Sequence, residues 1–401
     1  MVVLKRIKLE DEIELLYGKA LPKKQRVAGD IPVYGSNGIV DYHVEGCFKG
    51  PSIILGRKGT VGAVEYSKGD FWAIDTTYIV KTKSQEDDIK FWYYFLKTLN
   101  LDKMNTHSAV PGLNRGNVYA LTVDVLDSYA ERKRVAEILS SIDEKIEINN
   151  QINKKLDEIA QVIYKQWFVD FEFPNEGGHP YKSSGGEMVE SDLGVIPEGW
   201  EVKKINYIVE VTDYVANGSF AALKENVKTS DEIDYAMLIR LVDYNRNFKG
   251  PFTYVNKDGY EFLKKSKLFG GEIIISNVGA NAGTVFRVPK LDIPMTLGPN
   301  SIMLINNIYT NYLFYCLNSY WGQENLKGII GGSAQPKFNK TDFRNIKLVV
   351  PQEKVMNSYN HLIQPIVDKL SCLEKENQYL EFLRDLLLPK LMLGEIRVPV
   401  E

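Results

Sequence analysis

The sequence predicts a mixed α/β (α+β) protein made of two tandem copies of one globular domain, each followed by a long helix. Three observations predict it. The chain has 401 residues, more than one hydrophobic core usually fills. It contains an internal repeat, and a heptad-like apolar pattern follows each copy. We therefore expect the two helices to pair as an antiparallel coiled coil, with pseudo-twofold symmetry between the halves.

The repeat is clearest in a seven-residue segment before the last predicted strand of each half. Residues 108–114 (SAVPGLN) match residues 333–339 (SAQPKFN) with four identities. Upstream, the apolar run 53–55 leads into a glycine-rich loop, as the apolar run 273–275 does in the second half. Because such a repeat indicates a duplicated fold, we expect the same strand arrangement in both halves.

Composition and pattern place the boundaries of these parts. Ser128 and Glu131 form a capping-box pattern at the start of the first helix. Pro365 predicts a kink or break near Gln364 in the second helix. The region between the halves is rich in Gly, Ser and Pro, which is typical of a linker that lets the second domain swing. The predicted parts are domain 1 (1–126), helix 1 (127–170), linker (171–199), domain 2 (200–350), helix 2 (351–394) and tail (395–401).

The apolar seams of the two helices are expected to pack together, because neither is stable when exposed to water. Asn149 and Asn377 lie near the middle of their helices. Either they meet and fix the register at some cost in stability, or both face solvent, and the pattern leaves the two interpretations open. The predicted seam and docking residues are Val135, Ile138, Ile142, Asn149, Ile152, Leu156, Ile159, Ile163, Ile366, Leu370, Leu373, Asn377, Leu380 and Leu387.

Composition excludes several functional classes. The N-terminal residues contain no signal peptide or membrane span, and the three cysteines and four histidines are scattered. We therefore expect a cytoplasmic protein with no disulfide framework, no metal site and no membrane partner. The chain lacks a phosphate-binding P-loop and the motifs of amino-methyltransferases, metalloproteases and serine hydrolases. No residue is thus predicted to be catalytic.

The remaining candidates for chemistry lie in glycine-rich polar loops. Net charge is −3, but residues 1–126 and 201–350 each carry a small excess of Lys and Arg. Glycines after a buried strand let backbone N–H groups approach phosphates, and arginine reads guanine, although an ordinary turn has the same composition. Polar residues differ between the halves, as two readers of different sequences require. The candidate DNA contacts are Tyr34, Ser36, Asn37, Arg57, Lys58, Thr60, Ser108, Asn114, Arg115, Asn277, Asn281, Thr284, Arg287, Ser333, Gln335, Lys337 and Asn339.

Several segments, in order, resemble one known family. They are AERKRVAEILSSIDEKI (130–146), NNQIN (149–153), LDEIA (156–160), Trp167-Phe168, IPEGW (196–200) and LLPKLMLGEI (387–396). This arrangement resembles the specificity subunit of type I restriction-modification enzymes over the whole chain. Pro365 and the weakly matching residues 357–364 depart from the commoner pattern and put the symmetry of docking in doubt.

The resemblance implies two target-recognition domains that each read one half of a split, asymmetric sequence in double-stranded DNA, with the helix pair as a ruler. It also implies partners: two copies of a modification (methyltransferase) subunit and restriction/translocase subunits, which dock on the helices. S-adenosylmethionine, ATP and Mg²⁺ would belong to those partners, and this chain would hold no cofactor. The alternatives are a standalone DNA-modifying enzyme and a coiled-coil adaptor that does not touch DNA.

Overall fold

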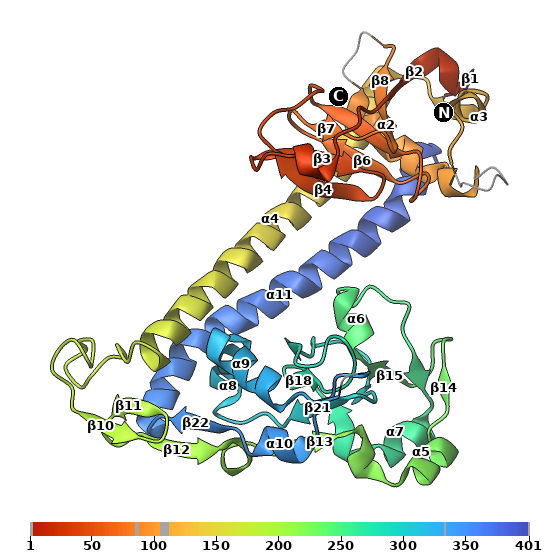
Figure 1. Ribbon diagram of the computed structural model, residues 1–401. Coiled ribbons are helices and arrows are strands. Elements are labelled where there is room, and N and C mark those ends of the chain that lie inside the picture. The colour runs from red at the N-terminus through yellow and green to blue at the C-terminus, as the bar shows by residue number, and fades with distance from the viewer. Residues whose placement is uncertain (1–2, 85–87, 105–111, 333, 400–401) are drawn as a thin grey trace. The chain divides into compact units, whose positions relative to one another are not determined.

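The computed structural model describes residues 3–84, 88–104, 112–332 and 334–399 (Figure 1). The chain folds into two compact units. Unit 1 comprises Met1–Asn149 and Glu376–Glu401, and unit 2 comprises Asn150–Lys375. Both boundaries fall inside long helices, α4 (Tyr129–Phe168) and α11 (Glu353–Met392). Each unit therefore contains one mixed domain and part of both helices.

Unit 1 is built around an antiparallel sheet in the order β2-β8-β5-β6. Its strands are Ile13–Tyr17, Thr77–Thr82, Ser52–Gly56 and Val64–Ser67. The run Ile53-Ile54-Leu55 is apolar throughout because both faces of β5 are covered. Ile53 and Leu55 pack in the core beneath α2 (Ile89–Thr98), and Ile54 packs in a smaller cluster on the other face. A second sheet has the order β4-β3-β7, with strands Gly38–His43, Ile31–Gly35 and Trp72–Ala73.

Unit 2 repeats this topology. Its antiparallel sheet has the order β13-β21-β18-β19, with strands Val211–Asp213, Ser301–Leu304, Ile273–Ser276 and Val285–Arg287. Its second sheet has the order β14-β16-β15-β20-β17, with strands Thr229–Ser230, Tyr254–Val255, Ala236–Ile239, Met295–Leu297 and Lys267–Leu268. The parallel pair β15–β20 corresponds to the parallel pair β3–β7. The predicted duplication of one fold is confirmed.

An additional antiparallel strand pair joins the two ends of each globular domain. It is β1 (Leu4–Lys8) with β9 (Thr122–Leu126) in unit 1, and β12 (Glu201–Lys204) with β22 (Lys347–Val350) in unit 2. The shorter helices are α1 (Leu9–Glu12), α3 (Arg115–Tyr119), α5 (Phe220–Asn226), α6 (Leu241–Asn245), α7 (Lys257–Phe262), α8 (Thr310–Asn318), α9 (Tyr320–Ile329) and α10 (Lys340–Arg344). None of the helices described has the length and apolar content that crossing a membrane requires.

The two long helices pack against each other in antiparallel fashion within each unit. In unit 1, Arg384 Nη1 donates to Asp143 Oδ1 at 2.8 Å, and Asn149 Nδ2 donates to Asn377 Oδ1 at 2.9 Å. Partner numbers on α11 fall as those on α4 rise, which defines the antiparallel direction. In unit 2, the Phe168 and Tyr359 rings lie 4.7 Å apart. Of the two interpretations left open for the asparagines, the structure selects the one in which they meet.

The predicted seam of α4 is partly wrong. Ile152 and Ile159 are 38% and 48% exposed, whereas Leu139, Ile146 and Ala160 are buried. The error has a physical cause: the true seam contains polar and small residues. Asn149 and Ala160 occupy it, so β-branched residues on the neighbouring face produced a more apolar pattern. Val135 and Ile142 are buried as predicted, and Ile138, Leu156 and Ile163 are half-buried.

The predicted seam of α11 agrees better with the structure. Leu373 and Asn377 are buried, and the other predicted positions, Ile366, Leu370, Leu380 and Leu387, are half-buried. The helix does not break near Gln364 but runs without interruption through Pro365. Pro365 and His361, whose carbonyl loses its helical N–H partner, are both exposed. Water can reach that carbonyl, which lowers the cost of a proline inside a helix.

Residues 171–199, predicted to be a linker, are folded in the structure. β10 (Met188–Ser191) and β11 (Gly194–Pro197) form a hairpin. Phe173 stacks on Tyr181 and on Trp200, with ring centroids 4.6 and 5.0 Å apart. These aromatic side chains join the unit 2 core at the end of α4. The packing of these aromatic side chains holds the segment in one conformation, although its Gly and Ser content predicted a flexible linker.

Candidate nucleic-acid interface

Three of the predicted polar segments meet at one edge of unit 1. The loop 57–62 follows β5, and its Arg57 carbonyl accepts from the Leu113 N–H at 2.8 Å. Lys58 and Gly112 form an isolated backbone bridge. Gly59 has φ of +81°, and a Cβ there would lie 3.1 Å from Ser36 Oγ in the β3–β4 turn. Residues 112–114, the described end of the repeat segment, therefore lie next to the glycine-rich loop, and that loop lies next to the β3–β4 turn.

Two guanidinium groups flank an exposed tyrosine at this edge. The Arg57 and Arg115 guanidinium carbons lie 4.9 and 5.2 Å from the centre of the Tyr17 ring, which belongs to a residue that is 49% exposed. Arg57 Nη1 donates to the Asp75 carbonyl at 3.0 Å. Such stacking fixes the guanidinium planes and leaves N–H groups for phosphate or base edges. Sequence reasoning missed Tyr17, because a lone tyrosine at a strand end carries no distinctive pattern.

The corresponding edge of unit 2 has the same backbone geometry but different side chains. The Phe338 N–H donates to the Asn277 carbonyl at 3.1 Å, as Leu113 does to Arg57 in unit 1. Gly279 N donates to the Pro336 carbonyl at 2.8 Å. Asn281, Gln335 and Lys337 are exposed there. An amide thus stands where unit 1 has an arginine.

Two predicted phosphate contacts have a structural role instead. Asn114 is the N-cap of α3, and its Oδ1 accepts from Gly116 N at 2.8 Å. Asn339 is the N-cap of α10, and its Oδ1 accepts from Asp342 N at 2.8 Å. The side-chain oxygen satisfies a free N–H of the first helical turn in each case. Helix capping explains why the asparagine occurs in both repeats.

Other predicted contacts are placed away from solvent. Tyr34 is 6% exposed and packs edge-on against Phe71, with ring centroids 5.8 Å apart, and burial raises the pKa of its hydroxyl. The Arg287 guanidinium lies 4.3 Å from the Phe314 ring centre, and burial lowers its pKa. The assignment of Tyr34 as a DNA contact is wrong, because its side chain lies in the core. Arg287 is half-buried against Phe314, and its assignment stays a prediction.

The remaining candidates divide by the partners of their side chains. Asn277 Nδ2 donates to the Phe338 carbonyl at 3.2 Å, and Thr284 Oγ1 donates to the Asn281 carbonyl at 2.9 Å. Their side chains therefore stabilise the loop. Ser108 and Ser333 lie outside the described residues. The candidates with at least partly exposed side chains are Ser36, Asn37, Arg57, Lys58, Thr60, Arg115, Asn281, Gln335 and Lys337.

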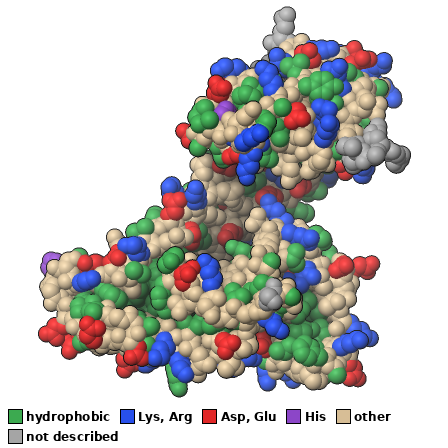
Figure 2. Space-filling model, viewed as in Figure 1, with side chains coloured by type: hydrophobic (Ala, Val, Ile, Leu, Met, Phe, Trp, Pro, Cys, Tyr) green, Lys and Arg blue, Asp and Glu red, His purple; other side chains and the backbone are tan. Residues whose placement is uncertain are grey.

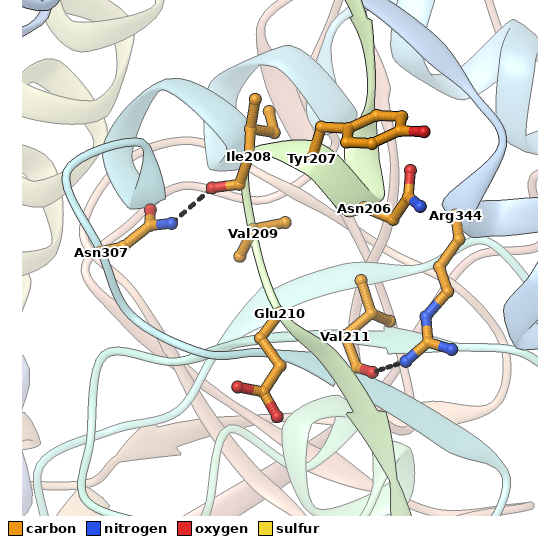
Figure 3. Close-up of a pocket in the computed structure, with 8 residues that line it drawn as sticks. All are labelled: Asn206, Tyr207, Ile208, Val209, Glu210, Val211, Asn307 and Arg344. Atoms are coloured by element: carbon orange, nitrogen blue, oxygen red, sulfur yellow. Dashed lines mark hydrogen bonds between the residues drawn. The ribbon is translucent and has the colours of Figure 1, made fainter.

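One hollow on the surface of unit 2 lies apart from these loops. It measures about 440 Å³ and is lined by 206–211, Asn307 and Arg344 (Figure 3). Asn307 Nδ2 donates to the Ile208 carbonyl at 2.6 Å, and the Arg344 guanidinium donates to the Val211 carbonyl. The main polar side chains there brace the backbone. Within the described ranges, no three His, Cys, Asp or Glu side chains are grouped as a metal site would require.

On the face that Figure 2 shows, surface charge is distributed over the described residues. On the face shown in Figure 2, the basic and acidic side chains of the described residues are interspersed over each unit. The described part of this face therefore has no large region of positive potential that would attract a polyanion. Binding would depend on the local groups of the loops.

Each unit also exposes apolar side chains on a long helix, away from the seam. In unit 1 these are Tyr379, Phe382 and Leu386 on α11 and Leu393 in the turn just after it, which are 65%, 66%, 45% and 50% exposed. In unit 2 they are Ile152, Ile159 and Val162 on α4 and Val169 in the turn just after it, which are 38%, 48%, 53% and 50% exposed. We call these sets the α11 stripe and the α4 stripe. Exposed apolar side chains that recur along one helix face are typical of protein–protein contact surfaces.

Comparison with known proteins gives one consistent result. The family model for the type I restriction modification DNA specificity domain matches residues 2–158 and 197–381. The type I restriction enzyme MjaIX specificity subunit of Methanocaldococcus jannaschii is 26% identical over 383 residues, covering 91% of this chain and 83% of that protein. The HindI specificity subunit of Haemophilus influenzae is 25% identical over 341 residues, covering 71% of each.

A solved structure has the same fold. The S subunit of the type I restriction-modification system from M. genitalium superposes with a TM-score of 0.63 at 17% identity, covering 98% of this chain and 96% of that one.

Proposed function

Because the chain belongs to the type I restriction modification DNA specificity family, we propose that it directs such a complex to a bipartite DNA sequence, each unit reading one half. The observation that carries the proposal is the pair of matches to the family model, which fall on two domains of one topology. The same backbone carries different polar side chains in the two units. Two half-sites of different sequence require that combination.

Within unit 1, we propose that loop residues contact phosphates and that two arginines contact bases. Lys58 and Thr60 are exposed in the glycine-rich loop and suit phosphate oxygens. Arg57 and Arg115 are held on the Tyr17 ring with N–H groups free to reach a groove. Phosphate contacts set the register, and a positioned arginine selects guanine through its O6 and N7 atoms.

The helices supply the assembly surface in this proposal. The α11 stripe and the α4 stripe would each bind one modification subunit, so that the complex would contain two copies of that subunit. Restriction/translocase subunits would then join the assembly. S-adenosylmethionine, ATP and Mg²⁺ would be bound by those partners in the cytoplasm. This chain would contribute sequence reading and no catalytic group.

The test is to identify the methylated sequence. The full chain, co-expressed with the modification subunit of its own system, should give a methylation motif with two separated halves in genomic sequencing, and deletion of the chain should remove that motif. Duplexes that carry the motif should be retained in gel shifts, and duplexes with either half scrambled should not. A continuous motif, or methylation that persists without this chain, contradicts the proposal.

A further inference from the structure

The two units differ in the loop that follows β3 in unit 1 and β15 in unit 2. β3 and β15 are equivalent, since each pairs in parallel with a short strand and antiparallel with the next strand along the chain. In unit 1, the next strand follows after two residues, Ser36 and Asn37. In unit 2, residues 240–253 intervene and include α6. The insertion thus begins where unit 1 has the turn that touches its glycine-rich loop.

Arg240 is the first residue of this insertion, and a buried carboxylate fixes its side chain. Arg240 Nε donates to Asp243 Oδ2 and Nη2 donates to Asp243 Oδ1, both at 3.2 Å. The Asp243 side chain is 0% exposed, and the Arg240 side chain is 30% exposed. A carboxylate on the Nε–Nη2 edge leaves the Nη1–Nη2 edge pointing away from it. The two N–H groups of that second edge have the spacing to donate to guanine O6 and N7.

The helix cap alone does not require an arginine. Asp243 Oδ2 also accepts from the Arg240 backbone N–H at 2.8 Å, a bond that any residue except proline at position 240 would form. The side chain at 240 must therefore serve the buried charge of Asp243, a ligand, or both. If position 298 carried a Cβ in place of Gly298, that atom would lie 2.6 Å from Arg240 Cγ. A side chain there would therefore displace the aliphatic part of Arg240.

The rest of the insertion has the character of a nucleic-acid contact. Tyr244, Arg246 and Lys249 are exposed on or just after α6. Residues 240–249 contain three cations and one acid, Asp243, which is already paired with Arg240. Cations beside an exposed aromatic ring favour phosphates and base edges. α6 stands beyond the end of β15, at the rim of the unit (Figure 1).

We infer that Arg240, held by Asp243, reads a guanine in the half-site bound by unit 2. The inference rests on the proposed function and adds to it the residue and the base. In this arrangement Arg240 contacts the base and Asp243 holds the Arg240 side chain in position. The exposed Arg246 contacts the DNA phosphate backbone.

The experiment uses the full chain with its modification subunit and the wild-type motif as defined by selection from a random duplex library. Arg240→Ala should lose discrimination at one G·C pair of one half-site by roughly ten- to a hundredfold, with the other half unchanged. Arg240→Lys keeps a positive charge next to Asp243 but lacks the paired N–H donors of the guanidinium. This variant should lose the same discrimination. Arg246→Ala is the matched control and should weaken binding to all duplexes alike.

Replacing each guanine of the motif by 7-deazaguanine gives a readout that a purely structural role would not move. Within the half-site that depends on Arg240, wild-type binding should fall when one particular guanine is replaced, and the Arg240→Ala variant should bind duplexes with guanine or 7-deazaguanine at that position equally. An unchanged motif in Arg240→Lys, or equal sensitivity of both proteins to 7-deazaguanine at every position of that half-site, overturns the inference and leaves the proposed function standing. A wild-type complex that selects no motif overturns both.

Discussion

At the scale of single residues, Arg57, which we propose as a DNA contact, is held in place by its own loop and by neighbouring groups. The Arg57 and Lys58 N–H groups both donate to the Thr76 carbonyl, at 2.9 and 3.1 Å, which fixes the start of the loop. The guanidinium is held by the Asp75 carbonyl and by the Tyr17 ring. Little conformational entropy remains to be lost when such a side chain binds DNA.

Replacing Arg57 by alanine should weaken binding of the cognate duplex by about 1–3 kcal/mol, because the fork contact and its charge are lost together. The measurement is a titration of the target duplex at several salt concentrations. Lys68→Ala, an exposed lysine in the turn after β6, is the control and should change affinity little.

Arg57→Lys separates the two roles of this arginine. If Arg57 reads guanine, lysine should restore affinity for all duplexes alike but not the preference for one base. If Arg57 binds only phosphate, lysine should restore wild-type behaviour. Unchanged affinity and base preference in Arg57→Ala would remove Arg57 from the interface.

At the scale of elements, the helix pair is held in register by a polar contact in its seam. Asn149 is 0% exposed and donates through Nδ2 to Asn377 Oδ1 and to Glu376 Oε2, both at 2.9 Å. Among the described residues, no hydrogen bond reaches the buried Asn149 Oδ1. A buried amide that is only partly satisfied costs stability but penalises shifted registers, which would bury it without a partner.

Asn149→Ala should destabilise the protein by about 1–3 kcal/mol, because the Asn377 amide is left buried with one partner fewer. The double variant Asn149→Leu/Asn377→Leu should be as stable as wild type or more stable, since both amides are removed together. Urea denaturation of Asn149→Leu, Asn377→Leu and the double variant measures the coupling. Additive effects of the two changes would show that the contact does not matter.

Much of the arrangement of elements was predictable from the sequence, and particular residues show why. The apolar runs at 53–55 and 273–275 identify central strands because both faces of these strands are buried. The α4 seam was less predictable, since Asn149 and Ala160 break its apolar pattern. Arg240 could not be identified from the sequence at all. Its role depends on the pairing of β15 with β20, which brings together segments far apart in the chain.

At the scale of the whole molecule, each globular domain is built onto one end of both long helices. The unit 1 core includes Val135 and Leu139 of α4 and Leu391 of α11. The unit 2 core includes Ala160 of α4 and Tyr359 of α11. Each domain therefore shares a core with its own helix ends. A domain cannot be exchanged without changing the residues that pack against these helices.

Exchange of residues 1–126 for the equivalent domain of another family member should change one half of the methylated motif and leave the other half intact. The junction needs care, because Arg132 of α4 has a side chain 8% exposed and pairs with Asp88 at 3.2 Å. Removing one partner of a buried pair costs about 3–5 kcal/mol.

A donor domain that keeps an acid at the Asp88 position should therefore give a stable hybrid, and the same donor with that acid changed to alanine should lose stability. Genomic methylation sequencing reads the motif, and thermal unfolding reads the junction. A hybrid that is folded but methylates a motif altered in both halves would mean that the two units do not read independently. The duplication would then have served assembly rather than recognition.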